Sequence, residues 1–536
     1  MRTISDHVKD LIEQLRHTEL RDDIWIQIAK AGEPAVISDL LYFVRSDENV
    51  TPASAAGVVQ ELLKLVRPSQ LPELDEKLRS ISAGYRGYIG ADYKDPWFGM
   101  NREDVGHLSR MNGNVAGLLG LASSHCNGYV RQAALEHLQT EWSGIELPFV
   151  ILRANDWVQP VRALAQSMLM KRITASYAAH LVRNAPLIAR MLLTARSDQS
   201  HFVEKIKSLL WRPDCREHLY SGMDSADPAT RRICFRWAME PDAEPSIAVI
   251  KRGMRTEDTV VNIDATRAVR SMPDSADRQE LLQSLQRSRV PRIRRECLYA
   301  AAEQTTPDAL LTLKSFLLDS NRAIREAARF YISRKEGCDY REFYRSVIMG
   351  AKTSPPATAV LGLGETGAKD DVDLLVPILS SPADRVVKAA IVALNQLDGE
   401  AQASRLFVYV SNQNPGVSSS ATTALADKVS HIRSDDLWRL VDSGERMHVR
   451  LNALKLINRL NQWDKLSFIL RACAIDDQIV AAKAREYSAH WLRDYNYLLK
   501  PRDQQQMELI AKTLKSYKNQ LEPAVEIGIR RLISDF

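Results

Sequence analysis

A two-residue anchor recurs along most of this chain at intervals of about 32 residues. Each anchor follows a polar turn and consists of Val or Ile, followed in most copies by a basic residue. The anchors are Val130, Val161, Ile293, Ile324, Val387, Val417, Val449 and Val480. Their separations are 31, 132, 31, 63, 30, 32 and 31 residues, and candidates at Val203, Thr230, Val260 and Ala357 divide the two long gaps. The spacing predicts about twelve similar units between residues 105 and 495, because a repeat of this length buries its apolar face against its neighbours.

Each unit carries the pattern of two amphipathic helices. Val372, Leu375, Val376 and Leu379 fall at i, i+3, i+4 and i+7, and a second apolar set, from Val386 to Leu397, follows a Ser-Pro-Ala-Asp breaker. One helical hairpin of this size cannot enclose its own apolar stripes, so it must lie against another hairpin. We therefore predict an all-α fold, a right-handed α-solenoid of stacked hairpins with irregular ends.

Two segments carry a resemblance to a known family. ATAVLGLGETGAKDDVDLLVPILSSPADRVVKAAIVALNQL and VPRIRRECLYAA resemble the HEAT-repeat superfamily, particularly its short phycobilisome-lyase-type units. The ankyrin T-P-L-H signature and the tetratricopeptide pattern of Trp, Leu-Gly and Tyr are missing. The resemblance covers nearly all of residues 105–495 and implies about twelve or more HEAT-like hairpins. It indicates little about function, since this superfamily includes scaffolds, adaptors, lyases and nucleic-acid-binding enzymes.

The regions outside the regular array are predicted to have other roles. Residues 1–83 indicate an N-terminal helical region with irregular repeats, and residues 84–104 an insert loop rich in Gly and aromatic residues, without a helical period. Residues 105–495 are the array, and residues 496–536 predict two helices that cap it. The insert loop suits either a second binding surface or a cover over a hydrophobic gap. Its candidate binding residues are Tyr85, Tyr88, Tyr93, Trp97 and Phe98.

Composition is that of a protein outside the membrane. Hydrophobic residues make up 45% and charged residues 26% of the chain, and no uninterrupted apolar run of about 18 residues could span a bilayer. The first residues, MRTISDHVKDLIEQLRH, mix charges of both signs and lack the apolar core of a secretory signal. We expect a cytoplasmic location and no membrane association.

Cysteine and histidine spacing does not indicate a metal site. The six cysteines occur singly, and neither a C-x-x-C pair nor an H-E-x-x-H motif is present. We expect no metal and interpret the cysteines as small core residues. They are Cys126, Cys215, Cys234, Cys297, Cys338 and Cys473.

The segment from Gly362 to Gly367 matches G-x-G-x-x-G, the form of a dinucleotide fingerprint. That fingerprint requires a preceding strand, whereas Ala357 to Leu363 has a helical pattern. We therefore predict no nucleotide cofactor, and we interpret Gly364 and Gly367 as ending a helix in a left-handed conformation. Neither G-x-S-x-G nor a Walker loop is present. We expect no enzymatic activity, although a catalytic site assembled from distant residues stays open.

The densest basic region lies between residues 287 and 335. Arg294 and Arg325 occupy anchor positions and suggest pairing within the array, with Asp319 as a candidate partner. If stacked repeats aligned the other arginines, a stripe suited to phosphates or acidic groups would result. Its candidate residues are Arg289, Arg292, Arg295, Arg322 and Arg329. Residues 211–350 hold 24 basic against 21 acidic side chains, a weak imbalance for a nucleic-acid footprint.

The leading hypothesis is a non-enzymatic scaffold or adaptor that binds a protein partner through its concave surface. The alternative is a nucleic-acid-binding solenoid that uses the Arg-rich face around residues 287–335. It would be similar to HEAT-like DNA glycosylases, whose catalytic residues have no match in this chain. A third hypothesis, a chromophore lyase, rests on the family resemblance alone. The partner's identity and the oligomeric state stay open.

Overall fold

A computed structural model describes most of the chain, and its described residues contain helices and turns but no strand. The described ranges are 4–17, 22–44, 52–88, 96–111, 115–193, 198–243, 246–443, 446–494, 504–517, 520–521 and 523–534. Within them no helix is long and apolar enough to cross a membrane.

The chain forms two compact units, residues 1–293 and residues 294–536. The helices that lie in the first unit are α1 (Asp6–His17), α2 (Asp22–Ala31), α3 (Ile37–Val44), α4 (Pro52–Leu65), α5 (Leu71–Tyr88), α6 (Asp104–Leu108), α7 (Val115–Ala122), α8 (Gly128–Leu138), α9 (Leu147–Arg153), α10 (Gln159–Arg172), α11 (Ala178–Arg183), α12 (Ala185–Arg190), α13 (Ser200–Trp211), α14 (Arg216–Gly222), α15 (Pro228–Ala238), α16 (Ile247–Arg255), α17 (Thr259–Ser271) and α18 (Ala276–Leu285).

Helix α19 (Pro291–Ala302) spans the boundary in the sequence. The helices of the second unit are α20 (Pro307–Ser315), α21 (Arg322–Ser333), α22 (Tyr340–Met349), α23 (Ala357–Thr366), α24 (Val372–Leu375), α25 (Asp384–Phe407), α26 (Pro415–Leu425), α27 (Ser434–Asp442), α28 (Met447–Ile457), α29 (Gln462–Ala472), α30 (Gln478–Asp494), α31 (Gln504–Tyr517) and α32 (Pro523–Ser534).

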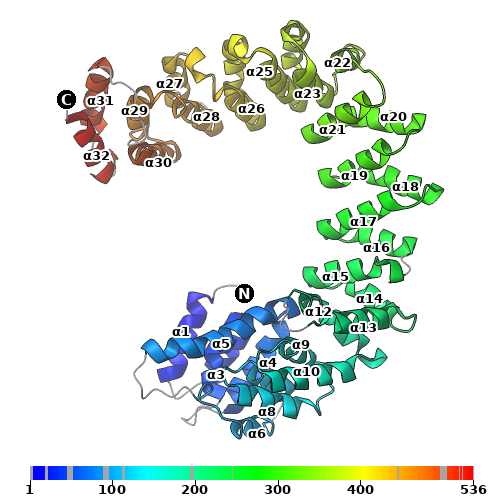
Figure 1. The fold of residues 1–536 in the computed structure, drawn as a ribbon. Coiled ribbons are helices and arrows are strands. Elements are labelled where there is room, and N and C mark those ends of the chain that lie inside the picture. The colour runs from blue at the N-terminus through cyan, green and yellow to red at the C-terminus, as the bar shows by residue number, and fades with distance from the viewer. Residues whose placement is uncertain are drawn as a thin grey trace. The chain divides into compact units, whose positions relative to one another are not determined.

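Consecutive helices pair as antiparallel hairpins, and hairpins stack side by side within each unit (Figure 1). Clear examples are α16 with α17 in the first unit and α27 with α28 in the second. The predicted anchors lie near the start of the second helices, and the eight primary anchors are at most 5% exposed. Val260, one of the candidate anchors in the 132-residue gap, is only partly buried, and its neighbour Val261 is the buried residue there. The stacking of apolar stripes that the period predicted is therefore the source of the core, and the all-α prediction is confirmed.

The stretch from Ala357 to Leu397 shows how one repeat is built. The first apolar set forms the short helix α24, which tightens into a 3-10 turn over Val376–Ser380 at Pro377. The second set begins α25, where Val386, Ala390 and Ala393 are buried. Asp398 has non-helical angles (φ −156°, ψ 58°), so α25 is two helices joined at a kink. The second helix of one hairpin thus leads directly into the next.

The prediction of an insert loop over residues 84–104 is wrong for residues 84–88, which are helical. Helix α5 continues to Tyr88 and α6 begins at Asp104. Leu71, Leu74 and Leu78 give α5 a buried stripe, and a helix already formed tolerates single glycines at a cost of about 1 kcal/mol each. Gly84 and Gly87 therefore do not end it.

Candidate functional site

Arginines of the second helices form ion pairs with an aspartate in the turn of the next repeat. In the first unit, Arg131 Nη2 lies 2.9 Å from Asp156 Oδ1, and Arg232 Nε lies 3.0 Å from Asp258 Oδ2. In the second unit, Arg294 Nε donates to Asp319 over 2.7 Å. Arg450 Nη1 lies 3.1 Å from Asp477 Oδ2. The predicted pairing of Arg294 with Asp319 is confirmed, and this Arg–Asp ladder links successive repeats.

Each ladder aspartate also organises the backbone that starts the following helix. Asp156 accepts from the Val158 amide over 2.9 Å, and Asp258 from the Val260 amide over 3.0 Å. In the second unit, Asp319 accepts from the Asn321 amide over 2.7 Å. A carboxylate is favoured here because the first amides of a helix have no partner within the helix. One side chain thus starts a helix and ties it to the repeat before it.

Three buried aspartates, Asp156 and Asp258 of the ladder and Asp371 elsewhere, are held in the ionised form. Burial would raise the pKa of Asp156, but the hydrogen bond from Arg131 and the charge of Arg153 outweigh it and lower that pKa. The same opposition lowers the pKa of Asp258, where burial is outweighed by Arg232. At Asp371, burial is outweighed by Arg341, whose Nε lies 2.7 Å from Oδ2, and the pKa is again lowered.

Acidification should therefore destabilise the fold. In the unfolded chain an aspartate has a pKa of about 3.9, and these three aspartates have lower pKa values in the folded chain. Their contribution is fully present above the unfolded value and is lost as the pH falls through the folded values. The urea midpoint, followed by circular dichroism, should be level from about pH 7 to 5 and fall below about pH 4. A midpoint that rises below about pH 4 would contradict this expectation.

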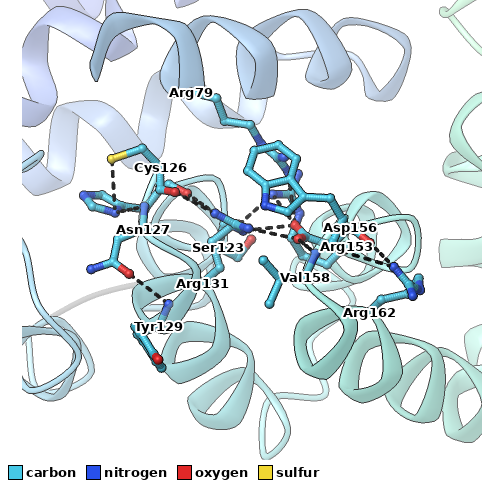
Figure 2. Close-up of polar contacts among 12 residues, drawn as sticks. Arg79, Ser123, Cys126, Asn127, Tyr129, Arg131, Arg153, Asp156, Val158 and Arg162 are labelled. Atoms are coloured by element: carbon cyan, nitrogen blue, oxygen red, sulfur yellow. Dashed lines mark hydrogen bonds and ion pairs between the residues drawn. The ribbon is translucent and has the colours of Figure 1, made fainter. Parts of the chain in front are cut away.

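The ladder is most elaborate around Asp156, where arginines from three helices converge (Figure 2). Arg131 donates to both carboxylate oxygens, Arg153 Nη1 lies 3.4 Å from Oδ2, and Arg79 Nη2 lies 3.3 Å from Oδ2. Asp75 on α5 pairs with Arg153 and, at 3.3 Å, with Arg79 Nε. We call these five residues the Asp156 cluster. Side chains of Arg131, Arg153 and Asp156 are at most 1% exposed.

The Asp156 cluster has more positive than negative charges. Three guanidinium groups share two carboxylates, a formal sum of +1. Burial, followed by the charge of Arg153, lowers the pKa of Arg79 to about 10. Trp157 lies against two of these groups, since the Cζ atoms of Arg79 and Arg131 are 4.6 and 4.7 Å from its ring centroid. The Trp157 side chain remains 50% exposed.

A cavity of about 470 Å³ opens beside the Asp156 cluster. Asp75, Arg79 and Trp157 form one part of its lining, and Leu187 and Met191 form another. Its walls come from α5, α9, the turn before α10, and α12 with the residue that follows it. No sequence pattern indicates this site, because Asp75 and Arg79 on α5 precede their partners Arg153 and Asp156 by 78 and 77 residues.

The five candidate arginines have different environments. Arg289 and Arg292 belong to the first unit and are exposed, and Arg322, in the second unit, is also exposed. Arg329 differs from these three: its Nη1 lies 2.9 Å from Glu365 Oε2 and 3.4 Å from Tyr344 Oη, and its side chain is only 15% exposed. Arg329 lies inward because it forms an ion pair with Glu365, which is 3% exposed and also pairs with Arg325.

The fifth arginine, Arg295, belongs to a cluster of aromatic and arginine side chains from two helices, which the sequence pattern does not indicate. Its Cζ lies 5.9 Å from the ring centroid of Tyr299 on α19, and the rings of Tyr299 and Tyr331 are 6.0 Å apart in an edge-on contact. On α21, Phe330 contacts Tyr331 at 5.2 Å and is 52% exposed, with Arg334 Cζ 4.6 Å from its ring centroid. We call these five residues the aromatic–arginine patch. It joins two neighbouring second helices within the second unit.

The candidate aromatic residues of residues 84–101 are not all on the surface. Trp97 is fully buried, and its carbonyl oxygen lies 3.0 Å from His125 Nε2, so its choice as a contact residue is wrong. Phe98 is partly buried and stacks on His125 at 6.3 Å. Trp97 fills the core because its ring offers a large apolar area. The side chains of Tyr85 and Tyr88 and the whole of Tyr93 lie outside the described residues.

The glycine motif has a packing role that differs from the predicted one. Gly364 lies within α23, and Gly367 has φ −78° and ψ −175°, so neither adopts the predicted left-handed conformation. A Cβ on Gly364 would lie 2.6 Å from the Cα of Ala393 on α25. Helices α23 and α25 approach so closely at this point that only a residue without a Cβ fits, which explains Gly364.

The six cysteines are present as thiols, and four of them are buried. Burial raises the pKa of Cys234 and Cys297 to about 12. In the described ranges no three His, Cys, Asp or Glu side chains converge in a way that could hold a metal ion. The buried thiols of Cys234 and Cys297 therefore behave as small apolar groups.

No protein-family model matches the chain, and no curated protein matches its sequence. Solved structures with a similar arrangement include a mutant of the karyopherin Kap121p, at 12% identity and a TM-score of 0.32, over 99% of this chain and 68% of that one. Kap95p, whose binding induces the switch loops of RanGDP to adopt the GTP-bound conformation, is 11% identical with a TM-score of 0.36, over 91% and 64%. The S. pombe condensin Cnd3-Cnd2 subcomplex is 13% identical with a TM-score of 0.33, over 98% and 79%.

This similarity concerns the arrangement of helices alone, and the chain spans only 64% and 68% of the lengths of the two karyopherins. Within each unit the architecture is defined by the stacked hairpins, their buried anchors and the Arg–Asp ladder. The described residues of each unit form an all-α stack of helical hairpins, as the repeat period predicted. Membership of the HEAT-repeat superfamily stays what the sequence resemblance implies.

Proposed function

We propose that this chain is a non-enzymatic scaffold that binds a protein partner through the surface formed by the second helices of its hairpins. The observation that carries the proposal is the aromatic–arginine patch on α19 and α21. Repeat arrays curve as their units stack, and this creates extended concave binding surfaces. A cytoplasmic location stays a prediction of the sequence.

The composition of the patch suits a protein partner. Aromatic residues and arginine are enriched at the centres of protein interfaces, where a few of them contribute most of the binding energy. Phe330 is already oriented by its contacts with Tyr331 and Arg334, yet half of its surface is exposed. A partner that covers Phe330 would remove apolar area from water while ordering few side chains.

The same region is poorly suited to a phosphate backbone. Arg294, Arg325 and Arg329 form ion pairs with Asp319 or Glu365. On α21 an exposed acidic residue, Glu326, lies one turn after Arg322. A surface that holds about 6 to 10 phosphates needs more uncommitted cations than these.

Replacing Phe330 by Ser should remove a specific partner, while Leu311→Ser should not. Leu311 is 65% exposed on α20, the first helix of the same hairpin, and so matches Phe330 in exposure. Affinity purification with quantitative mass spectrometry should recover a protein with wild type and Leu311→Ser that is lost with Phe330→Ser. Calorimetry with that purified protein should show binding weakened by about 30-fold, the effect of losing an interface hot spot worth about 2 kcal/mol.

Recovery of the same proteins by both variants, at equal affinity, would refute the patch as the binding surface. Fluorescence anisotropy with single-stranded and duplex oligonucleotides tests the alternative. An affinity that falls by about 10³ to 10⁵ between about 50 and 200 mM salt, and that Arg295→Ala with Arg322→Ala abolishes, would favour nucleic acid instead. We expect no such salt-dependent binding.

A further inference from the structure

We propose that the cavity beside the Asp156 cluster is a second binding site, which takes an acidic peptide segment of a protein partner. An apolar side chain of that segment would lie against Leu187, Met191 and Trp157. A neighbouring carboxylate would lie on the side of Arg79 and Arg190. The site belongs to the first unit and does not depend on the aromatic–arginine patch.

The shape and lining of the cavity support a side chain with an apolar body. Its volume of about 470 Å³ falls within the usual range of about 300–1,000 Å³ for ligand sites. Ile151 and Leu152 from α9 face the cavity together with Leu187 and Met191. Binding is favoured when an apolar group displaces water from such an apolar wall.

The charges around the cavity favour an anion. Of the charged residues that line the cavity, Arg79 and Arg190 balance Asp75 and Glu76, and the adjoining buried groups Arg131, Arg153 and Asp156 bring the sum to +1. Arg79 is held only 16% exposed among other guanidinium groups, where a further carboxylate would reduce their mutual repulsion. An arginine also pairs with a carboxylate through two parallel hydrogen bonds.

Trp157 is the element that joins the apolar and the charged sides. Its ring lies against Arg79 and Arg131 and lines the cavity, while half of its surface stays exposed. A ring held by two cations is already ordered, so a ligand that covers it has little additional side-chain entropy to overcome. This arrangement suits one short segment and not a long nucleic-acid track, which needs phosphate contacts along its length.

Panning a displayed library of random dodecapeptides on the full chain tests the proposal. Enriched sequences should carry Asp or Glu beside an apolar residue. Fluorescein-labelled copies of those peptides should bind wild type and lose affinity by about tenfold with Arg190→Glu, since charge complementarity at a binding site is reversed. Lys171→Glu, an equal charge reversal at an exposed position of α10, should leave binding unchanged.

A second variant tests occupancy of the cavity without altering charge. Ser80 is exposed on the cavity rim, so Ser80→Trp should block the opening and abolish binding while the melting temperature stays unchanged. Phe330→Ser should bind the peptides like wild type, so a negative result for this site can be distinguished from a negative result for the proposed function. No enrichment, enrichment of basic or uncharged sequences, or equal binding by Arg190→Glu would overturn the proposal.

Discussion

Asp156→Asn should lower the free energy of unfolding of the first unit by about 3–5 kcal/mol, the cost of removing one partner from a buried ion pair. The substitution keeps the shape of the side chain and one oxygen that can accept from the Val158 amide. It removes the charge that Arg79, Arg131 and Arg153 share, and Asp75 alone then faces three guanidinium groups. Urea denaturation followed by circular dichroism measures the change.

Asp214→Asn is the matched control within the same unit. Asp214 accepts two hydrogen bonds from Arg212, at 3.1 and 2.7 Å, but the two side chains are 49% and 57% exposed. Exposed pairs of this kind contribute less than about 1 kcal/mol. Equal losses from the two substitutions would show that the Asp156 cluster stabilises the fold no more than a surface pair does.

Gly364→Ala should lower the free energy of unfolding of the second unit by about 1–3 kcal/mol, as overpacking of a core does. The new Cβ would lie 2.6 Å from the Cα and 2.7 Å from the Cβ of Ala393, so α23 and α25 would have to separate. This steric cost opposes the gain of about 1 kcal/mol that alanine brings to a helix interior. Thermal and urea denaturation of the single variant measure the net effect.

Gly57→Ala should act in the opposite direction. Gly57 is an exposed residue of α4, and a Cβ there would meet nothing within 4 Å. Alanine should therefore raise the free energy of unfolding by about 0.4–1 kcal/mol, chiefly by restricting the unfolded chain. Stabilisation by both substitutions would show that α23 and α25 have more room between them than the structure indicates.

The hairpins could be predicted from the sequence because their cause is periodic and local. Val449 and Val480 stand 31 residues apart, and both are fully buried at the start of α28 and α30. Arg294 and Asp319 belong to successive repeats, so a regular spacing also predicted their contact. Helices α31 and α32 lie within the C-terminal segment expected to contain two helices, and their capping role stays a prediction.

Exceptions arose where a repeat departs from the pattern. Arg325 has no aspartate in the following turn, Gly350–Pro356, and pairs instead with Glu365 on α23, 40 residues later. Gly364 was correctly interpreted as structural, but a glycine required for close packing and one required for a positive φ look the same in a sequence. Trp97 likewise carries no sign of its burial, since aromatic residues serve both cores and binding surfaces.

The sequence by itself determined the class of fold, since apolar residues at a helical period within a repeat of about 32 residues can be buried only by stacking hairpins. Tertiary structure alone decided the candidate sites. Arg79 reaches Asp156 across 77 residues of chain, and the aromatic–arginine patch forms because α19 and α21 bring Tyr299 and Tyr331 within 6.0 Å. A site depends on which side chains meet and on which of their charges are already paired, and neither is expressed in the spacing of residues along one helix.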